Sequence, residues 1–297
     1  MLVRTGKGEE FAVIVGVPKE VKDNEFRVAA TPEGVLELTH AGRRVLVQDG
    51  AGEGSSLLQE RYVKAGAGIV GTAEEVWGGA EMILKVKEPV EQEYDLMQEG
   101  QLLFTYLHLA AVRPLTEKLI ERKVAAVAYE TVQDTAGRLP LLAPMSEVAG
   151  RMAPHVGARL LEKEYGGPGH PDGRGVGRSA RQGPGARRRH GRVERRMTTH
   201  SDPTYLEEGV VHYCVGNMPG AVPNTSTYAL TNVTLPYILA MAELGLQEAV
   251  RRDPALALGV NAFGGALTNH AVAEAHGLPS SPLADVLPGG PRVRTGA

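Results

Sequence analysis

The sequence predicts an α/β protein built on a parallel sheet. Short apolar runs alternate with helical segments from residue 13 to about residue 130. This order is typical of right-handed β-α-β units, in which helices join neighbouring parallel strands. The composition agrees, because 42% hydrophobic and 23% charged residues are usual in a globular protein.

The strands are expected where apolar runs end at turn residues. The expected strands are Val13–Val17, Arg44–Gln48, Gly68–Val70, Met82–Val86, Leu102–Leu107 and Ala125–Tyr129. A helix follows the first strand, with Thr31 as its N-cap, Pro32 in its first position and Gly42 at its end. Shorter helices are expected at Tyr62–Gly66 and Thr72–Trp77, and the polar stretch 24–27 is expected to be exposed.

The second half of the chain is richer in predicted helix. Pro144–Leu161 is expected to be one long helix, capped by Ser146 and kinked at Pro154. One strand is expected at Val210–Val215. The helices expected after it are Thr227–Leu244, Glu248–Leu258 and Leu267–His276.

Residues 165–197 differ from everything around them. Nine of these residues are Gly and nine are Arg, and none is Lys, Ile, Leu or Phe. Such a stretch cannot bury apolar surface, so it is not expected to fold alone. We expect it to be irregular.

The overall charge and cysteine content exclude several classes of protein. The net charge is −3, which gives no sign of nucleic-acid binding, since the Arg-rich stretch is offset elsewhere. The single cysteine, Cys214, rules out an internal disulfide and suits a reducing cytoplasm. No run of membrane-spanning length is expected, and no metal site is expected.

Charged side chains follow the predicted strands at the edge where open α/β sheets bind ligands. Arg27 follows the first strand, Lys85 and Lys87 end the third clear strand, and His108 and Glu130 follow the next two. Arg can grip a carboxylate with two hydrogen bonds, Lys adds a point charge, and His can move a proton near neutral pH. Together they predict a pocket for a small anionic substrate.

Each of these residues also has a purely structural interpretation. Arg27 could be a surface group, and His108 a hydrogen-bonded structural histidine. Glu130 could cap the following helix. Lys85 and Lys87 are two apart in a strand, so both could point to one solvated face.

Several longer runs carry a resemblance to a known family. NEFRVAATP, ILKVKEP, LLFTYLHLA, PMSEVAGR and CVGNMPGAVPNTSTY resemble segments of NAD-dependent L-alanine dehydrogenases. The resemblance covers roughly residues 13–164 and 198–287. Transhydrogenase α subunits share RVAATP, but they match KDNEF, FTYLHLA and NMPGAVP less well.

The resemblance implies a role for each site residue. Arg27 and Lys87 would bind the substrate carboxylate, and His108 would be the catalytic acid–base group. The nicotinamide side of the cleft would be lined by Met145, Ser146, Val215, Asn217 and Met218. The implied reaction is oxidation of L-alanine to pyruvate and ammonia with NAD, in a cytoplasmic homo-oligomer that is a hexamer in the family.

The resemblance also implies a missing domain. Residues 13–164 would form the first part of a substrate-binding domain and 198–287 the part that returns to it. Residues 165–197 would stand in place of a Rossmann-type NAD-binding domain, which needs on the order of 100 residues. The chain would then be inactive with NAD, and a surface including Met145, Val215 and Met218 would be exposed.

Three other functions stay open from the sequence. The chain could be a non-catalytic module that binds small 2-keto or 2-amino acids or joins subunits. It could be a transhydrogenase α-subunit-like protein. The Arg-rich stretch could also be a flexible arm that binds RNA, although Tyr165 is its one aromatic residue.

A shift of reading frame would explain the Arg-rich stretch. If its Arg codons are CGN and are read one base later, Arg187–Arg192 can encode Gly-Ala-Gly-Thr-Val-Gly. That is the glycine fingerprint of a dinucleotide-binding turn. We interpret 165–197 as out-of-frame translation with part of the domain lost, a hypothesis that the nucleotide sequence would decide.

Overall fold

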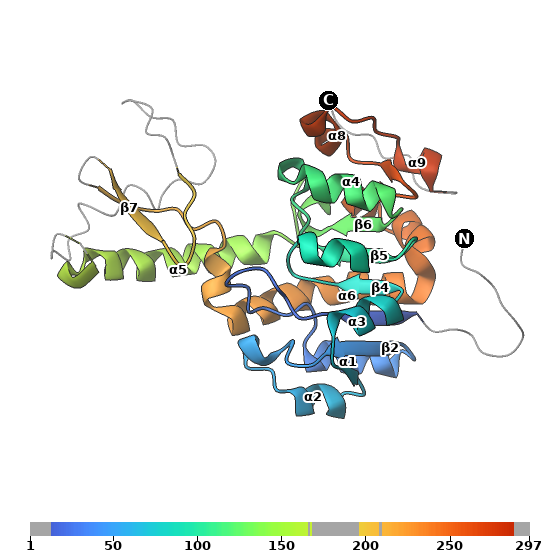
Figure 1. Ribbon diagram of the computed structural model, residues 1–297, viewed down its shortest axis with the longest axis horizontal. Helices are drawn as coiled ribbons and strands as arrows, with labels where there is room; N and C mark the ends of the chain where they lie inside the picture. The colour runs from blue at the N-terminus through green and yellow to red at the C-terminus, as the bar shows by residue number, and fades with distance from the viewer. Residues whose placement is uncertain (1–12, 166, 168–195, 208–209, 288–297) are drawn as a thin grey trace, which may run out of the picture.

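An eight-stranded, mostly parallel sheet forms the centre of the molecule (Figure 1). The computed structural model describes residues 13–165, 167, 196–207 and 210–287. The strand order in the sheet is β10-β9-β6-β5-β4-β1-β2-β3. Strands β1 to β6 are all parallel to one another, as the alternation of strands and helices predicts.

The elements follow one another along the chain as short strands and mostly short helices. The strands are β1 Ile14–Val17, β2 Arg44–Gln48, β3 Gly68–Val70, β4 Met82–Leu84, β5 Leu102–Thr105, β6 Ala125–Ala128, β7 Thr204–Glu207, β8 Val210–Tyr213, β9 Val260–Phe263 and β10 Ala266–Leu267. The α-helices are α1 Pro32–His40, α2 Gln59–Lys64, α3 Ala73–Gly79, α4 Arg113–Glu121, α5 Ala143–Leu161, α6 Pro223–Arg252, α7 Pro254–Gly259, α8 His270–His276 and α9 Leu283–Val286.

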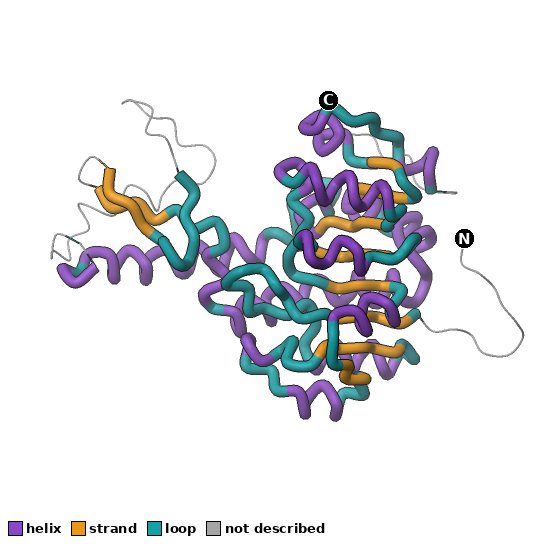
Figure 2. The backbone as a smooth tube through the Cα atoms, viewed as in Figure 1, coloured by secondary structure: helices purple, strands orange, loops and turns teal. Residues whose placement is uncertain are grey.

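Helices cover both faces of the sheet (Figure 2), and each face has its own hydrophobic core. Successive side chains of a strand point to opposite faces, so Leu102 and Phe104 belong to one core and Leu103 to the other. The first core includes residues of α1, α2, α6 and α7, and the second includes residues of α3, α4 and α8. Because both faces are covered, the central strands are apolar along their whole length.

Local sequence signals set the first helix as expected. The Thr31 hydroxyl accepts a hydrogen bond from the Gly34 amide, and Pro32 opens α1. Gly42 has φ +77°, which is the left-handed conformation expected just beyond a helix end. The strands at Arg44–Gln48 and Gly68–Val70 are confirmed at their predicted limits, whereas four others, including Val210–Val215, end one or two residues earlier than predicted.

The predicted parallel sheet carries antiparallel strands at one edge. Val260–Phe263 forms β9, which pairs antiparallel with β6, and β10 pairs antiparallel with β9. The sequence analysis missed both strands, and β10 occupies the start of a helix predicted at Leu267–His276. The cause is their length, because a four-residue buried run after a helix carries no period of its own. The strand β7 was missed for the same reason.

The two longest helices differ from their predicted limits. Helix α6 begins at Pro223, earlier than predicted, and Gly245 interrupts it with φ +73° and ψ 159°. This interruption falls where the first predicted helix ends, at Leu244. Helix α5 begins at Ala143 with Leu142 at the N-cap, so the prediction that Ser146 caps it is wrong. The helix continues through Pro154.

The second half of α5 leads away from the main sheet (Figure 1). The separate hairpin β7–β8 is drawn on the same side of the molecule, and its strands pair antiparallel from Thr204 with Tyr213 to Glu207 with Val210. The prediction that 165–197 is irregular falls mainly on residues 168–195, which lie outside the described residues.

Helix α6 is long and apolar enough to cross a membrane, by length and composition alone. No run of membrane-spanning length was predicted. Residues Leu230, Ile238 and Met241 of α6 belong to the first hydrophobic core, and a core helix of a globular protein satisfies the same criterion of length and composition.

Glycine is required where β1 crosses α3. A Cβ added to Gly16 would lie 2.7 Å from the Ala80 Cβ and 2.8 Å from a Val76 methyl carbon. We expect Gly16→Ala to lower the free energy of unfolding by about 1–3 kcal/mol, the usual range for overpacking. The matched control is Gly78→Ala within α3, where a Cβ meets nothing within 4 Å. Because Ala is the better helix former, that variant should gain up to about 1 kcal/mol. Equal behaviour of the two variants in urea unfolding would contradict the packing described here.

Candidate functional site

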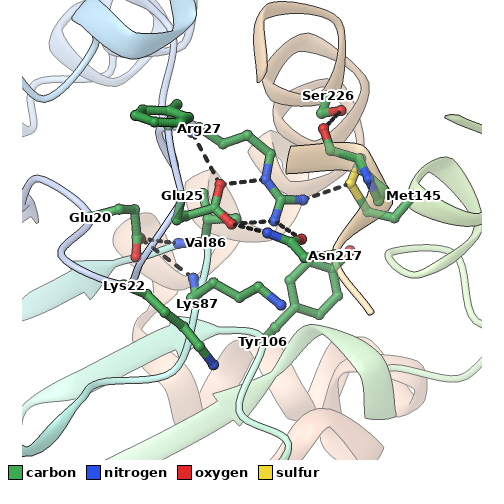
Figure 3. A network of polar contacts seen from close by, with 12 residues as sticks. Glu20, Lys22, Glu25, Arg27, Val86, Lys87, Tyr106, Met145, Asn217 and Ser226 are labelled. Carbon is green, nitrogen blue, oxygen red and sulfur yellow. Dashed lines mark hydrogen bonds and ion pairs between the residues drawn. The ribbon is translucent and has the colours of Figure 1, made fainter. Parts of the chain in front are cut away.

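The candidate site lies at the carboxyl ends of four adjacent strands. Strands β6, β5, β4 and β1 are neighbours in the sheet, and each is followed by one of the predicted polar positions. The segments after these strands therefore meet at one edge, as in other open α/β sheets. The loop before α6 joins them and brings Asn217 to the same place (Figure 3).

Arg27 is buried in the centre of this site, with 2% of its surface exposed. The expectation that the stretch 24–27 is exposed is wrong for Arg27 and Glu25. The Arg27 guanidinium donates two hydrogen bonds to the Glu25 carboxylate, through Nε at 2.6 Å and through Nη2. Nη2 also donates to the Asn217 Oδ1 at 2.8 Å, and Nη1 lies 3.1 Å from the Met145 Sδ.

Glu25 is the internal partner of Arg27. Its carboxylate also accepts a hydrogen bond from the Asn217 amide nitrogen at 3.1 Å. Burial alone would raise the pKa of Glu25, but hydrogen bonds and charge from Arg27 lower it below its ordinary value. Glu25 is therefore an anion in this site, and it neutralises the charge of Arg27.

Two hydroxyl groups hold the loop that carries Arg27. The Ser55 hydroxyl donates to the Phe26 carbonyl at 3.0 Å and lies 2.8 Å from the Thr227 hydroxyl. The Thr227 hydroxyl in turn accepts a hydrogen bond from the Val28 amide at 3.2 Å. Since Phe26 and Val28 flank Arg27, these bonds fix its backbone on both sides.

Lys87 is the cation of the site that has no carboxylate partner of its own. Its side chain is half-buried, and Figure 3 shows it extended toward the ring of Tyr106. Within the described residues the Lys87 ammonium makes no hydrogen bond or ion pair. Burial and the positive charge of Arg27 lower the pKa of Lys87. A bound anion would relieve both effects.

Lys85 points away from the site into the protein, so a shared solvated face with Lys87 is ruled out. Its ammonium is fully buried, 3.2 Å from a Glu20 oxygen and 2.8 Å from a Glu93 oxygen. Burial alone would lower the pKa of Lys85, but the two carboxylates raise it. Glu20 also accepts the Val86 amide at 2.6 Å. This buried cluster fixes the end of β4 and has a structural role.

His108 sits at the exposed side of the site. Its backbone has φ +49°, an uncommon left-handed conformation for a residue other than Gly. The Glu130 carboxylate accepts hydrogen bonds from the backbone amides of His108, at 2.6 Å, and Leu107. Glu130 thus holds the His108 loop and does not cap a helix.

The His108 ring faces a second carboxylate. Its Nδ1 lies 3.4 Å from an oxygen of Glu88, whose other oxygen contacts the Lys22 ammonium. Burial alone would raise the pKa of Glu88, but His108 and Lys22 lower it to about 2. Glu88 is therefore ionised and can orient the ring, while 44% of the His108 side chain stays exposed.

The five residues predicted to line the nicotinamide side do not form one exposed surface. Met145 and Val215 are both 7% exposed, so the predicted apolar patch is wrong for these two. Met218 is half-buried, and Ser146 is exposed. Asn217 uses both atoms of its amide on Arg27 and Glu25.

Among the described residues, no glycine-rich turn is built as a dinucleotide site. One run, 66–71, has the G-x-G-x-x-G spacing, but its middle residues form the edge strand β3. In a dinucleotide site the glycines come after a strand and lead into a helix. Here the Glu75 carboxylate accepts the amides of Gly71 and Thr72, so an internal anion already occupies the start of α3.

This site has no metal-binding cluster among the described residues, and the described groove lies elsewhere. The described residues hold no group of three or more His, Cys, Asp or Glu side chains that could bind a metal. The described groove between α1 and α6 is lined by Thr31, Leu38, Leu235 and neighbouring residues, and it excludes Arg27, Lys87 and His108.

The geometry supports binding of a small anion beside a proton-carrying group. Lys87 supplies positive charge, and the exposed His108 supplies an ionisable ring. The sequence analysis missed Glu25 and Glu88, which hold Arg27 and His108 respectively, and it assigned Asn217 to the cofactor instead. Both glutamates are close in sequence to residues that it selected, so pairing of opposite charges near a strand end was the available signal.

These features define an α/β protein whose parallel strands end at a cluster of charged side chains. Comparison of this chain with protein-family models identifies the family. The model described as Alanine dehydrogenase/PNT, N-terminal domain matches residues 16–149, and the corresponding C-terminal domain matches residues 186–270. The chain belongs to the alanine dehydrogenase family of oxidoreductases.

Individual relatives agree with this assignment. The alanine dehydrogenase of Lysinibacillus sphaericus is 42% identical, over 89% of this chain and 97% of the relative. That of Methanococcus maripaludis is 40% identical, over 93% and 100%. A solved L-alanine dehydrogenase superposes with a TM-score of 0.80 at 36% identity, over 89% and 99%. A transhydrogenase from Sinorhizobium meliloti, at 18% identity and a TM-score of 0.63, shares the fold.

The relatives contain segments that have no counterpart in this chain. The match with the Lysinibacillus protein extends over 362 residues, whereas it takes in 89% of a chain of 297 residues. The difference must be made up by residues of the relative that face gaps here.

The buried Lys85 cluster gives a direct test of its structural role. Lys85→Met leaves Glu20 and Glu93 buried without their cation, so we expect the free energy of unfolding to fall by about 3–5 kcal/mol. Burial raises the pKa of Glu20, so protonation should restore part of this loss as the pH falls from about 7 to about 5. Lys123→Met, which removes an exposed pair with Glu99, should cost less than about 1 kcal/mol. A small, pH-independent loss in Lys85→Met would contradict this account.

Proposed function

We propose that this chain retains the pyruvate and L-alanine site of an alanine dehydrogenase but does not turn over with NAD by itself. The observation that carries the first half is the half-buried Lys87, which has no ion-pair partner in the described residues and lies near Arg27. Such an ammonium can form an ion pair with a small carboxylate.

Each side chain has a distinct task in this proposal. Lys87 attracts the substrate carboxylate, and Arg27 with Asn217 forms the inner wall against which it rests. His108 polarises the substrate carbonyl and carries the proton, because its ring is exposed and Glu88 fixes its orientation at 3.4 Å. NAD, when bound in a family member, accepts the hydride that leaves L-alanine.

The second half of the proposal concerns residues 165–197. We place the lost NAD-binding domain here, between 13–164 and 198–287, the two parts of the substrate-binding domain. Two observations support the loss itself: the relatives have extra residues facing gaps in this chain, and the run 66–71 does not form a phosphate cradle. Its place at 165–197 is proposed from the resemblance. Ser146 and Met218, two of the residues predicted to line the nicotinamide side, would then face a cleft that lacks its second wall.

A binding or oligomerisation module is the second candidate function. The observation that favours it is the closed Glu25–Arg27–Asn217 cluster, which is complete without any ligand. We further propose a cytoplasmic location, because the single Cys214 suits a reducing compartment. A homo-oligomer, a hexamer as in the family, is proposed from the resemblance. A transhydrogenase-like role has less support, since the similarity there extends to the fold alone.

Calorimetric titration with pyruvate tests the site. We expect the purified chain to bind pyruvate with a dissociation constant of about 1 mM, as suits a small anion held by one free cation. Lys87→Met should weaken binding at least about tenfold, because it removes that cation. Lys64→Met, an exposed change on α2, should leave binding unchanged.

The titration also separates the two candidate functions. Heat of binding that disappears in Lys87→Met supports a retained substrate site. No heat with pyruvate or L-alanine at about 10 mM would mean a dissociation constant well above the millimolar range. That result would reject the retained site and leave the oligomerisation module.

A further inference from the structure

We infer that Glu25 is a specificity-determining residue that restricts this site to acids with one carboxylate. The inference rests on the proposed function, because it assumes that a substrate carboxylate binds beside Lys87. Its starting observation is that Glu25 and Arg27 form a buried pair, with side chains 0% and 2% exposed.

The first step is the charge of the site. Arg27 carries one positive charge, and the bidentate Glu25 carboxylate cancels it. Lys22 likewise contacts the carboxylate of Glu88, which also faces the His108 ring. Lys87 is left as the uncompensated cation among these residues, so the site has charge for one substrate carboxylate and not for two.

The second step is the position of the internal carboxylates. Glu25 and Glu88 are both close enough to Lys87 to act on its charge. A small acid bound at Lys87 therefore lies near two carboxylates. A second negative group on the substrate would meet one of them, and like charges at short range in a poorly solvated site repel strongly.

The third step is that Glu25 cannot readily become neutral. Arg27 and Asn217 together donate to both of its oxygens, which lowers its pKa. The negative wall is thus permanent near neutral pH. Glu25 also positions Arg27, because the two planar groups hold each other in one orientation.

The test compares L-lactate with L-malate, which carries a second carboxylate, by calorimetry on the full chain. We expect the wild type to bind lactate at least about tenfold more tightly than malate. Glu25→Gln keeps the size and the acceptor oxygen but removes the charge, and it should reduce this ratio by about tenfold. The matched control is Glu37→Gln on the exposed surface of α1, which should leave the ratio unchanged.

The outcomes are distinguishable. If the wild type binds lactate and the ratio is the same in Glu25→Gln, the inference about Glu25 is wrong while the proposed site stands. If the wild type binds neither acid, the proposed site fails, and the inference fails with it.

A second variant covers a failure of Glu25→Gln to fold, which thermal unfolding would reveal. Asn217→Asp keeps the side-chain shape and adds a second carboxylate beside Arg27. It should weaken lactate binding by about tenfold. Unchanged lactate affinity in this folded variant would overturn the charge argument.

Discussion

The buried ion pair between Glu25 and Arg27 is the constraint on which the site depends. It fixes the segment after β1, and through Asn217 it ties that segment to the loop before α6, 190 residues further along the chain. Both partners are almost fully buried, so loss of either would leave a charge in a poorly solvated place. The pair therefore ties the segment after β1 to the loop before α6 and also sets the charge of the site.

The order of strands in the sheet explains why distant residues form one site. Strands β1, β4, β5 and β6 are adjacent and parallel, so the residues after them converge. Apolar runs with turn residues at their ends predicted these strands, and the convergence of Arg27, Lys87 and His108 followed from the sheet edge alone. Signals of this kind depend on local sequence and on one topological rule, which is why they could be read without a structure.

Other features depend on contacts that no local pattern encodes. The position of β9 beside β6 is set by tertiary packing, and its four residues follow directly after the end of helix α7. Lys85 and Lys87 look equivalent in sequence, yet the first is neutralised by Glu20 and Glu93 inside the protein. The partners of Arg27 and His108 could have been sought among nearby glutamates, but which glutamate faces which cation follows only from three-dimensional geometry.

If the proposed function is right, the chain keeps a substrate site without the cofactor-binding part of the family fold. Incubating the purified full chain with L-alanine and NAD, and following NADH by its absorbance, tests this claim most directly. A full-length relative such as the Lysinibacillus sphaericus enzyme serves as the positive control. The account predicts no NADH formation by this chain under conditions in which it binds pyruvate. Steady alanine-dependent formation of NADH would contradict it.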